Sequence, residues 1–90
     1  MAKIKFTSAL KRFFPLLTEL EIEGNTVKEV LLNVEKIHPG ISNYLVDDQG
    51  GLRTHLNIFI KGDMIRDRKL LNDTVKQTDE LLIFQALSGG

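Results

Sequence analysis

The sequence predicts an α+β domain in which one main helix packs across a mixed sheet of four to five strands. Two alternating runs, residues 3–10 and 17–23, predict a pair of strands near the start of the chain. Apolar residues with helical spacing follow over 27–37, and an almost wholly apolar run over 81–87 predicts a central strand. Strands, one helix and further strands in this order are typical of an α+β domain.

The two opening strands are expected to form an antiparallel hairpin. Residues 3–10 alternate polar and apolar side chains, and in the second run Leu20 and Ile22 alternate with glutamates. The segment 11–15 between them is expected to be a loop, since Pro15 lacks the amide hydrogen that a strand ladder uses.

The helix over 27–37 has clear start and stop signals. Thr26 and Glu29 form the pattern of a capping box, and Pro39-Gly40 is expected to end the helix. Its apolar face comprises Val27, Val30, Leu31, Val34 and Ile37.

The second half of the chain is expected to alternate loops with strands. In chain order we expect an irregular connection over 41–52, a strand over 55–60, a short returning strand over 64–66, one helical turn within 72–77 and the last strand over 81–87. A crossover through the helix would place the last strand centrally and parallel to the first. That topology is the β-grasp, or ubiquitin-like, fold.

Composition narrows the class of protein. The 90 residues suit one domain, expected over 1–87 with a flexible tail over 88–90, and the 12 basic residues balance the 12 acidic ones. This balance argues against nucleic acid as a partner. The absence of cysteine excludes disulfides, thiolate metal sites and a cysteine nucleophile, and it suits a reducing cytoplasm. Neither a membrane span nor a signal peptide is expected.

We expect no metal site. His38 and His55 are far apart in sequence, with no cysteine to assist them. The loop around Asp47 and Asp48 lacks the regular spacing and terminal glutamate of a calcium loop, so a solvated turn is favoured.

The sequence ends in Ser88-Gly89-Gly90, which is the main candidate site. Two glycines without side chains can thread into a narrow active-site tunnel, and the Gly90 carboxylate can be activated as an acyl-adenylate. Taken alone, the dipeptide also fits a frayed terminus or an engineered remnant.

A docking surface is predicted beside this tail. If Leu81 and Ile83 face the helix, their neighbours on the last strand face outward; a phase shift of one residue would instead bury Phe84. Arg66 either steers an acidic partner or merely solvates the edge. The predicted surface comprises Phe59, Phe84, Leu82, Leu87 and Arg66.

Several blocks resemble a known family when read in order toward the end of the sequence. They are Leu56-Asn57-Ile58-Phe59-Ile60, Lys61-Gly62, Asp63-Met64-Ile65-Arg66, Thr78-Asp79-Glu80-Leu81 and Gln85-Ala86-Leu87-Ser88-Gly89-Gly90. Together they resemble the MoaD/ThiS-type ubiquitin-like sulfur carriers, which serve molybdopterin synthase, the thiamine pathway and a cysteine synthase. The segments 40–42 and 47–51 look most like the cysteine-synthase type. Gln85 and Ser88 depart from the family's usual proline and alanine.

The resemblance implies a carrier and not an enzyme, with no bound cofactor. A partner resembling ubiquitin-activating enzymes would use ATP to adenylate Gly90, and a sulfur source would convert it to a thiocarboxylate. The implied partners also include a sulfur-accepting synthase and a metal-dependent hydrolase that processes the tail; the free protein is expected to be a monomer. Two alternatives stay open: a modifier joined through Gly90 to substrate lysines, and an interaction module with an inert tail.

Overall fold

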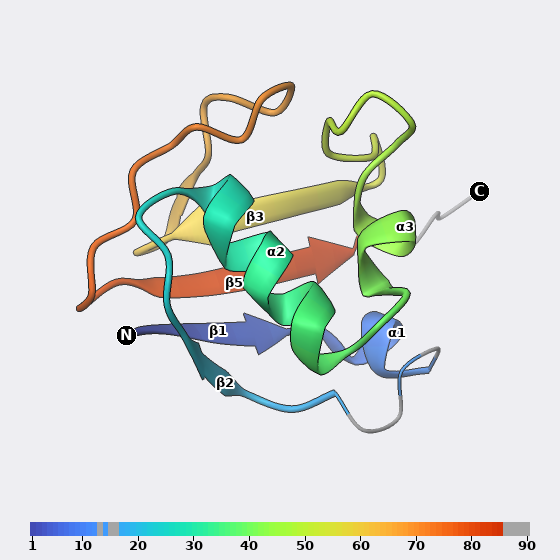
Figure 1. Cartoon of the computed structure of the whole chain (residues 1–90), viewed down its shortest axis with the longest axis horizontal. Helices are drawn as coiled ribbons and strands as arrows, with labels where there is room; N and C mark the ends of the chain where they lie inside the picture. Colours follow the sequence, from blue (N-terminus) through green and yellow to red (C-terminus); the bar gives the residue numbers. More distant parts are fainter. Residues whose placement is uncertain (13, 15–16, 86–90) are drawn as a thin grey trace.

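The computed structural model describes residues 1–12, 14 and 17–85, which form one mixed sheet crossed by a helix (Figure 1). The five strands lie in the order β2-β1-β5-β3-β4, with β1 and β5 parallel and the other neighbours antiparallel. The elements are β1 (Ala2–Phe6), α1 (Ser8–Lys11), β2 (Leu20–Ile22), α2 (Val27–Ile37), α3 (Ile41–Leu45), β3 (Leu56–Ile60), β4 (Asp63–Met64) and β5 (Glu80–Gln85). This arrangement confirms the predicted β-grasp fold.

The core lies between α2 and one face of the sheet. Ile4, Leu81 and Ile83 have no exposed surface, and the α2 residues Val30 and Val34 pack among them. Each such side chain contributes about 1.5–3 kcal/mol on burial. Alternate residues of the strands face the opposite side, which we call the open face because no described helix covers it.

The ends of α2 form as the sequence predicts. The Thr26 hydroxyl accepts from the Glu29 amide at 3.2 Å, and the Glu29 carboxylate accepts from the Asn25 amide at 2.9 Å. At the other end the Glu35 carboxylate accepts from the Gly40 and Ser42 amides, both at 2.8 Å. These bonds, the one from Gly40 foremost, lower the pKa of Glu35.

Two predicted assignments are wrong because they missed short helices. The first strand ends at Phe6, and the next residues form α1, which buries Leu10 completely. The connection over 41–52 is not wholly irregular, since it begins with α3, whose Ile41 and Leu45 lie one turn apart and are buried. Helices of four and five residues are too short to show a helical period.

The helical turn predicted within 72–77 is also wrong. This segment runs extended and pairs with the residues that enter α2. Thr26 and Thr74 form an antiparallel bridge, and the Val75 amide donates to the Asn25 carbonyl at 2.9 Å. Leu71 and Val75 are buried and four residues apart, as on one face of a helix. Here, however, both lie along an extended segment that packs against the core.

None of the helices that the structure describes has the length and apolar character needed to cross a bilayer. The longest, α2, has 11 residues and one polar side.

Candidate functional site

The open face carries a cluster of apolar side chains over β3, β4 and β5. Strand register places Phe59 beside Leu82 on one side and Met64 on the other. Phe84 extends the cluster along β5, with its ring centroid 6.4 Å from that of Phe59 and the planes at 85°. We call Phe59, Met64, Leu82 and Phe84 the apolar cluster.

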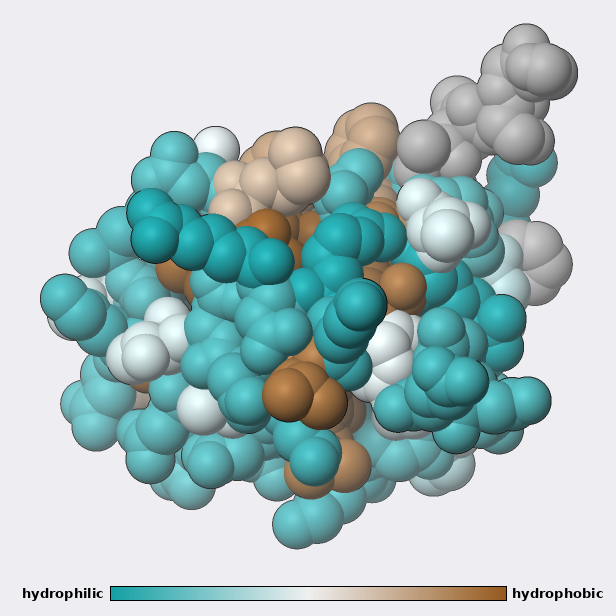
Figure 2. Space-filling model, turned by 90° about the horizontal axis from the view of Figure 1, so that it is seen from above, coloured by the Kyte–Doolittle hydropathy of each residue, from teal (hydrophilic) through white to brown (hydrophobic). Residues whose placement is uncertain are grey.

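The cluster is exposed where the helix side of the sheet is not. Phe84 is 40% exposed and Met64 is 54% exposed, whereas Leu81 and Ile83 are fully buried. Figure 2 shows hydrophobic residues at the upper margin of the molecule and further ones near its centre. Exposed apolar patches bordered by polar residues are typical of surfaces that bind partners.

The strand phase predicted for Leu82, Phe84 and Phe59 is confirmed, while their role as docking residues stays a prediction. Met64 was missed, although the alternation that exposes Phe59 continues across the turn into β4 and could have revealed it. Arg66 is exposed in the loop after β4, and its backbone amide donates to the Asp73 carboxylate at 3.0 Å. Leu87 and the segment 88–90 lie outside the described residues.

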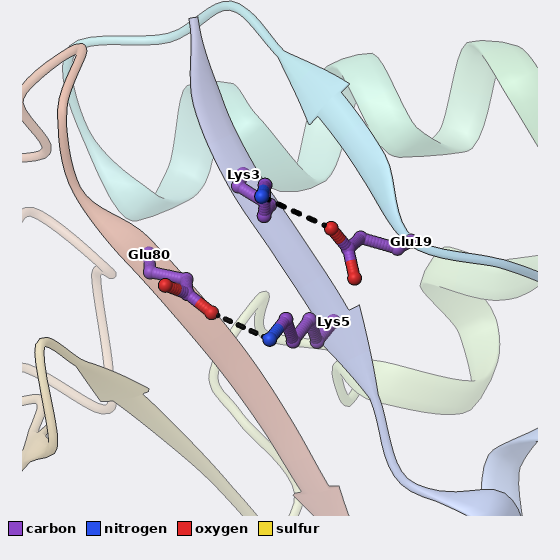
Figure 3. Close-up of polar contacts among 4 residues, drawn as sticks. All are labelled: Lys3, Lys5, Glu19 and Glu80. Carbon is purple, nitrogen blue, oxygen red and sulfur yellow. Dashed lines mark ion pairs between the residues drawn. The ribbon is translucent and has the colours of Figure 1, made fainter.

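Charged pairs occupy the other half of the open face (Figure 3). Lys5 Nζ lies 2.7 Å from Glu80 Oε1, and Lys3 Nζ lies 3.2 Å from Glu19 Oε1. The hydrogen bond to Glu80 raises the pKa of Lys5, and the same bond lowers the pKa of Glu80. Because these side chains are about half exposed, the pairs contribute little stability and serve mainly to neutralise this half of the face.

A shallow hollow of about 500 Å³ joins the charged half to the apolar cluster. Phe59 and Leu82 contribute apolar lining, and Lys5 and Lys61 stand among its lining residues. Glu80 lines it as well, and both lysines are ion-paired, Lys5 with Glu80 and Lys61 with Asp79.

Asp79 fixes the turn that leads into β5 and hence the position of the hollow. Its side chain is 5% exposed; Oδ2 accepts from the Lys76 amide at 2.8 Å, and Oδ1 lies 3.2 Å from Lys61 Nζ. The bond from Lys76 foremost, with Lys61 in support, lowers the pKa of Asp79 although burial acts to raise it.

The end of β5 is anchored just before the tail. The Gln85 amide donates to the Thr7 hydroxyl at 3.2 Å, and the Thr7 amide donates to the Ile83 carbonyl at 3.1 Å. Thr7, directly before α1, therefore holds the described end of β5 in place, next to Phe84.

The described residues of the open face combine the exposed apolar cluster with charged pairs. The described part of the chain includes no group of three or more histidine or acidic side chains placed to hold a metal ion. The turn around Asp47 is closed by its own carboxylate, which accepts from the Gln49 amide at 2.9 Å and the Gly51 amide at 3.1 Å.

Comparison with known proteins agrees with this geometry. The ThiS family profile matches residues 4–90, so the chain belongs to the ThiS family and has its ubiquitin-like β-grasp fold. No protein of curated function matches the sequence.

Solved structures cover the chain almost end to end. A chain in the crystal structure of the BexX/CysO complex of Amycolatopsis orientalis is 27% identical, with a TM-score of 0.86 and full coverage of both chains. The solution structure of small archaeal modifier protein 1 (SAMP1) from Methanosarcina acetivorans is 28% identical, with a TM-score of 0.78 and coverage of 99% of this chain and 95% of that one. Mycobacterium tuberculosis CysO, at 21% identity and a TM-score of 0.83 over 97% of this chain and all of that one, shares the fold.

Proposed function

We propose that the protein is a sulfur carrier whose Gly90 carboxylate is adenylated by a partner enzyme and converted to a thiocarboxylate. The observation that carries the proposal is the position of the apolar cluster on the strand that precedes the tail. Leu82 and Phe84 lie on β5, and five residues, 86–90, follow Gln85 in the sequence. Extended, they span about 17 Å, so an enzyme seated on the cluster can reach the carboxylate.

The chemistry begins with a group that is a poor electrophile. Attack of the Gly90 carboxylate on the α-phosphorus of ATP releases pyrophosphate and forms a mixed anhydride with AMP. Hydrosulfide then attacks the carbonyl carbon and the bond to AMP breaks, which leaves a thiocarboxylate and one proton. With a persulfide donor, the first product is an acyl disulfide, and a second thiol must cleave it.

In this account the chain supplies the reacting carboxylate and the docking surface, while the partners supply catalysis. ATP belongs to the activating enzyme. The thiocarboxylate is a soft nucleophile that can deliver sulfur to a synthase, with cysteine or homocysteine, molybdopterin and thiamine formation as the candidate routes. We place this exchange in the cytoplasm because the sequence contains no cysteine that would need an oxidising compartment.

A modifier role is the second candidate, and the similarity to SAMP1 favours it. Conjugation begins with the same adenylate, and the two roles diverge when either a sulfur nucleophile or a substrate lysine attacks it. The carrier role and the modifier role would both use the apolar cluster for docking and the tail for activation.

A gel containing an organomercury matrix tests the carrier proposal. The chain has no cysteine, so incubation with host extract, ATP and sulfide should give a retarded band only if a thiocarboxylate has formed. A variant lacking Gly89-Gly90 should show no retarded band. If the intact protein migrates like this variant and instead appears in heavier lysine-linked adducts, the modifier role replaces the carrier role.

A further inference from the structure

The outer edge of β2 is an open strand edge. In the sheet order, β2 lies at one end, and among the described strands β1 alone is its neighbour. The Lys3 amide donates to the Asp79 carbonyl at 3.1 Å, so the backbone groups of Lys3 point toward β5. Because backbone direction alternates along a strand, Ala2 and Ile4 point toward β2.

This alternation determines which backbone amide and carbonyl groups of β2 remain free to hydrogen-bond with another strand. Ile22 and Leu20 lie opposite Ala2 and Ile4 and complete the ladder with β1, which turns the amide and carbonyl of Glu21 outward. Among the residues that the structure describes, none hydrogen-bonds to these two groups. The Glu23 carbonyl accepts from the Asn33 side chain at 2.7 Å, and this bond closes the edge at that end.

The charge along this edge is acidic. Glu19, Glu21 and Glu23 alternate through and beside β2, and Glu19 is the one paired with Lys3 (Figure 3). Glu21 and Glu23 are exposed, and no described lysine or arginine forms an ion pair with either. A hollow of about 340 Å³ lies at the Glu23 end, and its lining includes Glu23 and Glu29 together with Met1, Asn25 and Asn33.

We propose that the outer edge of β2 docks an extended basic segment of a partner protein. The segment would pair with the outward backbone groups of Glu21 and place lysine or arginine side chains beside Glu21 and Glu23. A second copy of β2 is a poor occupant, since antiparallel pairing would bring glutamates against glutamates. β1 lies between β2 and β5, the nearest strand that carries part of the apolar cluster, so the β2 edge and the cluster are separate surfaces.

The test is a titration of the ¹⁵N-labelled full chain with the blocked peptide Ac-Lys-Val-Lys-Val-Lys-NH₂, followed by amide chemical shifts. We expect saturable shifts confined to residues 18–24. Glu21→Gln keeps the edge amide but removes the charge, and it should weaken binding about two- to fivefold. Glu21→Pro also removes the outward amide, which β1 does not use, and should abolish binding.

Three controls keep the result interpretable. Asp48→Asn removes a charge from an exposed loop and should leave the affinity unchanged. The peptide methylated at its central amide nitrogen should bind poorly even if Glu21→Pro does not fold, and Ac-Glu-Val-Glu-Val-Glu-NH₂ should not bind. Equal affinity for the acidic peptide, unchanged binding by Glu21→Pro and the methylated peptide, or shifts centred on the apolar cluster would each overturn the proposal.

Discussion

Phe84 is the residue on which docking should depend most. Its ring is 40% exposed, contacts Phe59 edge to face and precedes the tail on β5. Aromatic side chains of this kind contribute much of the energy of an interface when a partner desolvates them.

Phe84→Ala should therefore weaken binding to the activating enzyme by roughly 1–2 kcal/mol, or about five- to thirtyfold in Kd. Leu32→Ala is the matched control, because Leu32 is 54% exposed on α2, on the helix side of the sheet. Titration calorimetry with the partner compares the two. If both variants lose the same binding free energy toward the activating enzyme, the apolar cluster is not the docking site.

Asp79 is the residue whose protonation should affect folding most directly. Its folded pKa lies below its usual value of 3.8, so its stabilising effect is complete above the unfolded pKa and is lost as pH falls through the folded pKa. Asp79→Asn should lower the unfolding free energy by about 1–3 kcal/mol at neutral pH, since a buried charged acceptor is lost.

Urea unfolding at pH 7 and at about pH 3 checks this expectation. The difference in unfolding free energy between wild type and Asp79→Asn should be smaller at the lower pH. Asp48→Asn, in an exposed loop, should show no comparable gap at either pH. If the difference in unfolding free energy is equally large at low pH, the Asp79→Asn substitution destabilises the fold for a reason other than the lost charge.

At the scale of elements, α2 depends on its N-cap. Thr26→Ala removes the acceptor of the Glu29 amide and should lower the unfolding free energy by about 0.5–2 kcal/mol. Thr78→Ala, at an exposed position outside the helices and strands, should have little effect. Thermal unfolding of the two variants measures the difference, and equal melting temperatures would rule out a stabilising cap.

The elements that the sequence predicts well are those with local signals long enough to read. α2 has a cap, a stop and three turns of apolar spacing, and β5 has a continuous apolar run. α1 and α3 lack such length. Leu10 satisfies a strand alternation and a helical turn equally well, and only its packing in the folded chain distinguishes them.

The extended segment over 72–77 was missed for a different reason. Its conformation is set by hydrogen bonds to the start of α2, such as that from the Val27 amide to the Asp73 carbonyl at 3.1 Å. Hydrogen-bond partners that lie more than 40 positions apart produce no local pattern in the sequence. Met64 likewise becomes part of the site only through its register with Phe59.

For the whole molecule, topology brings together what the sequence separates. The parallel pairing of β1 with β5 places the start of α1 against the last strand, so Thr7 anchors Gln85. The antiparallel pairing of β3 with β5 sets Phe59 beside Leu82. The result is an exposed apolar surface at the described end of β5.

Whether Gly90 carries sulfur can be read from the intact mass of the protein recovered from its native host under thiol-trapping conditions. We expect a population in which one oxygen is replaced by sulfur, with fragmentation locating the change at Gly90. A free acid accompanied by adducts linked through substrate lysines would contradict it in favour of a modifier. A free acid without adducts would leave a ubiquitin-like interaction module with an inert tail.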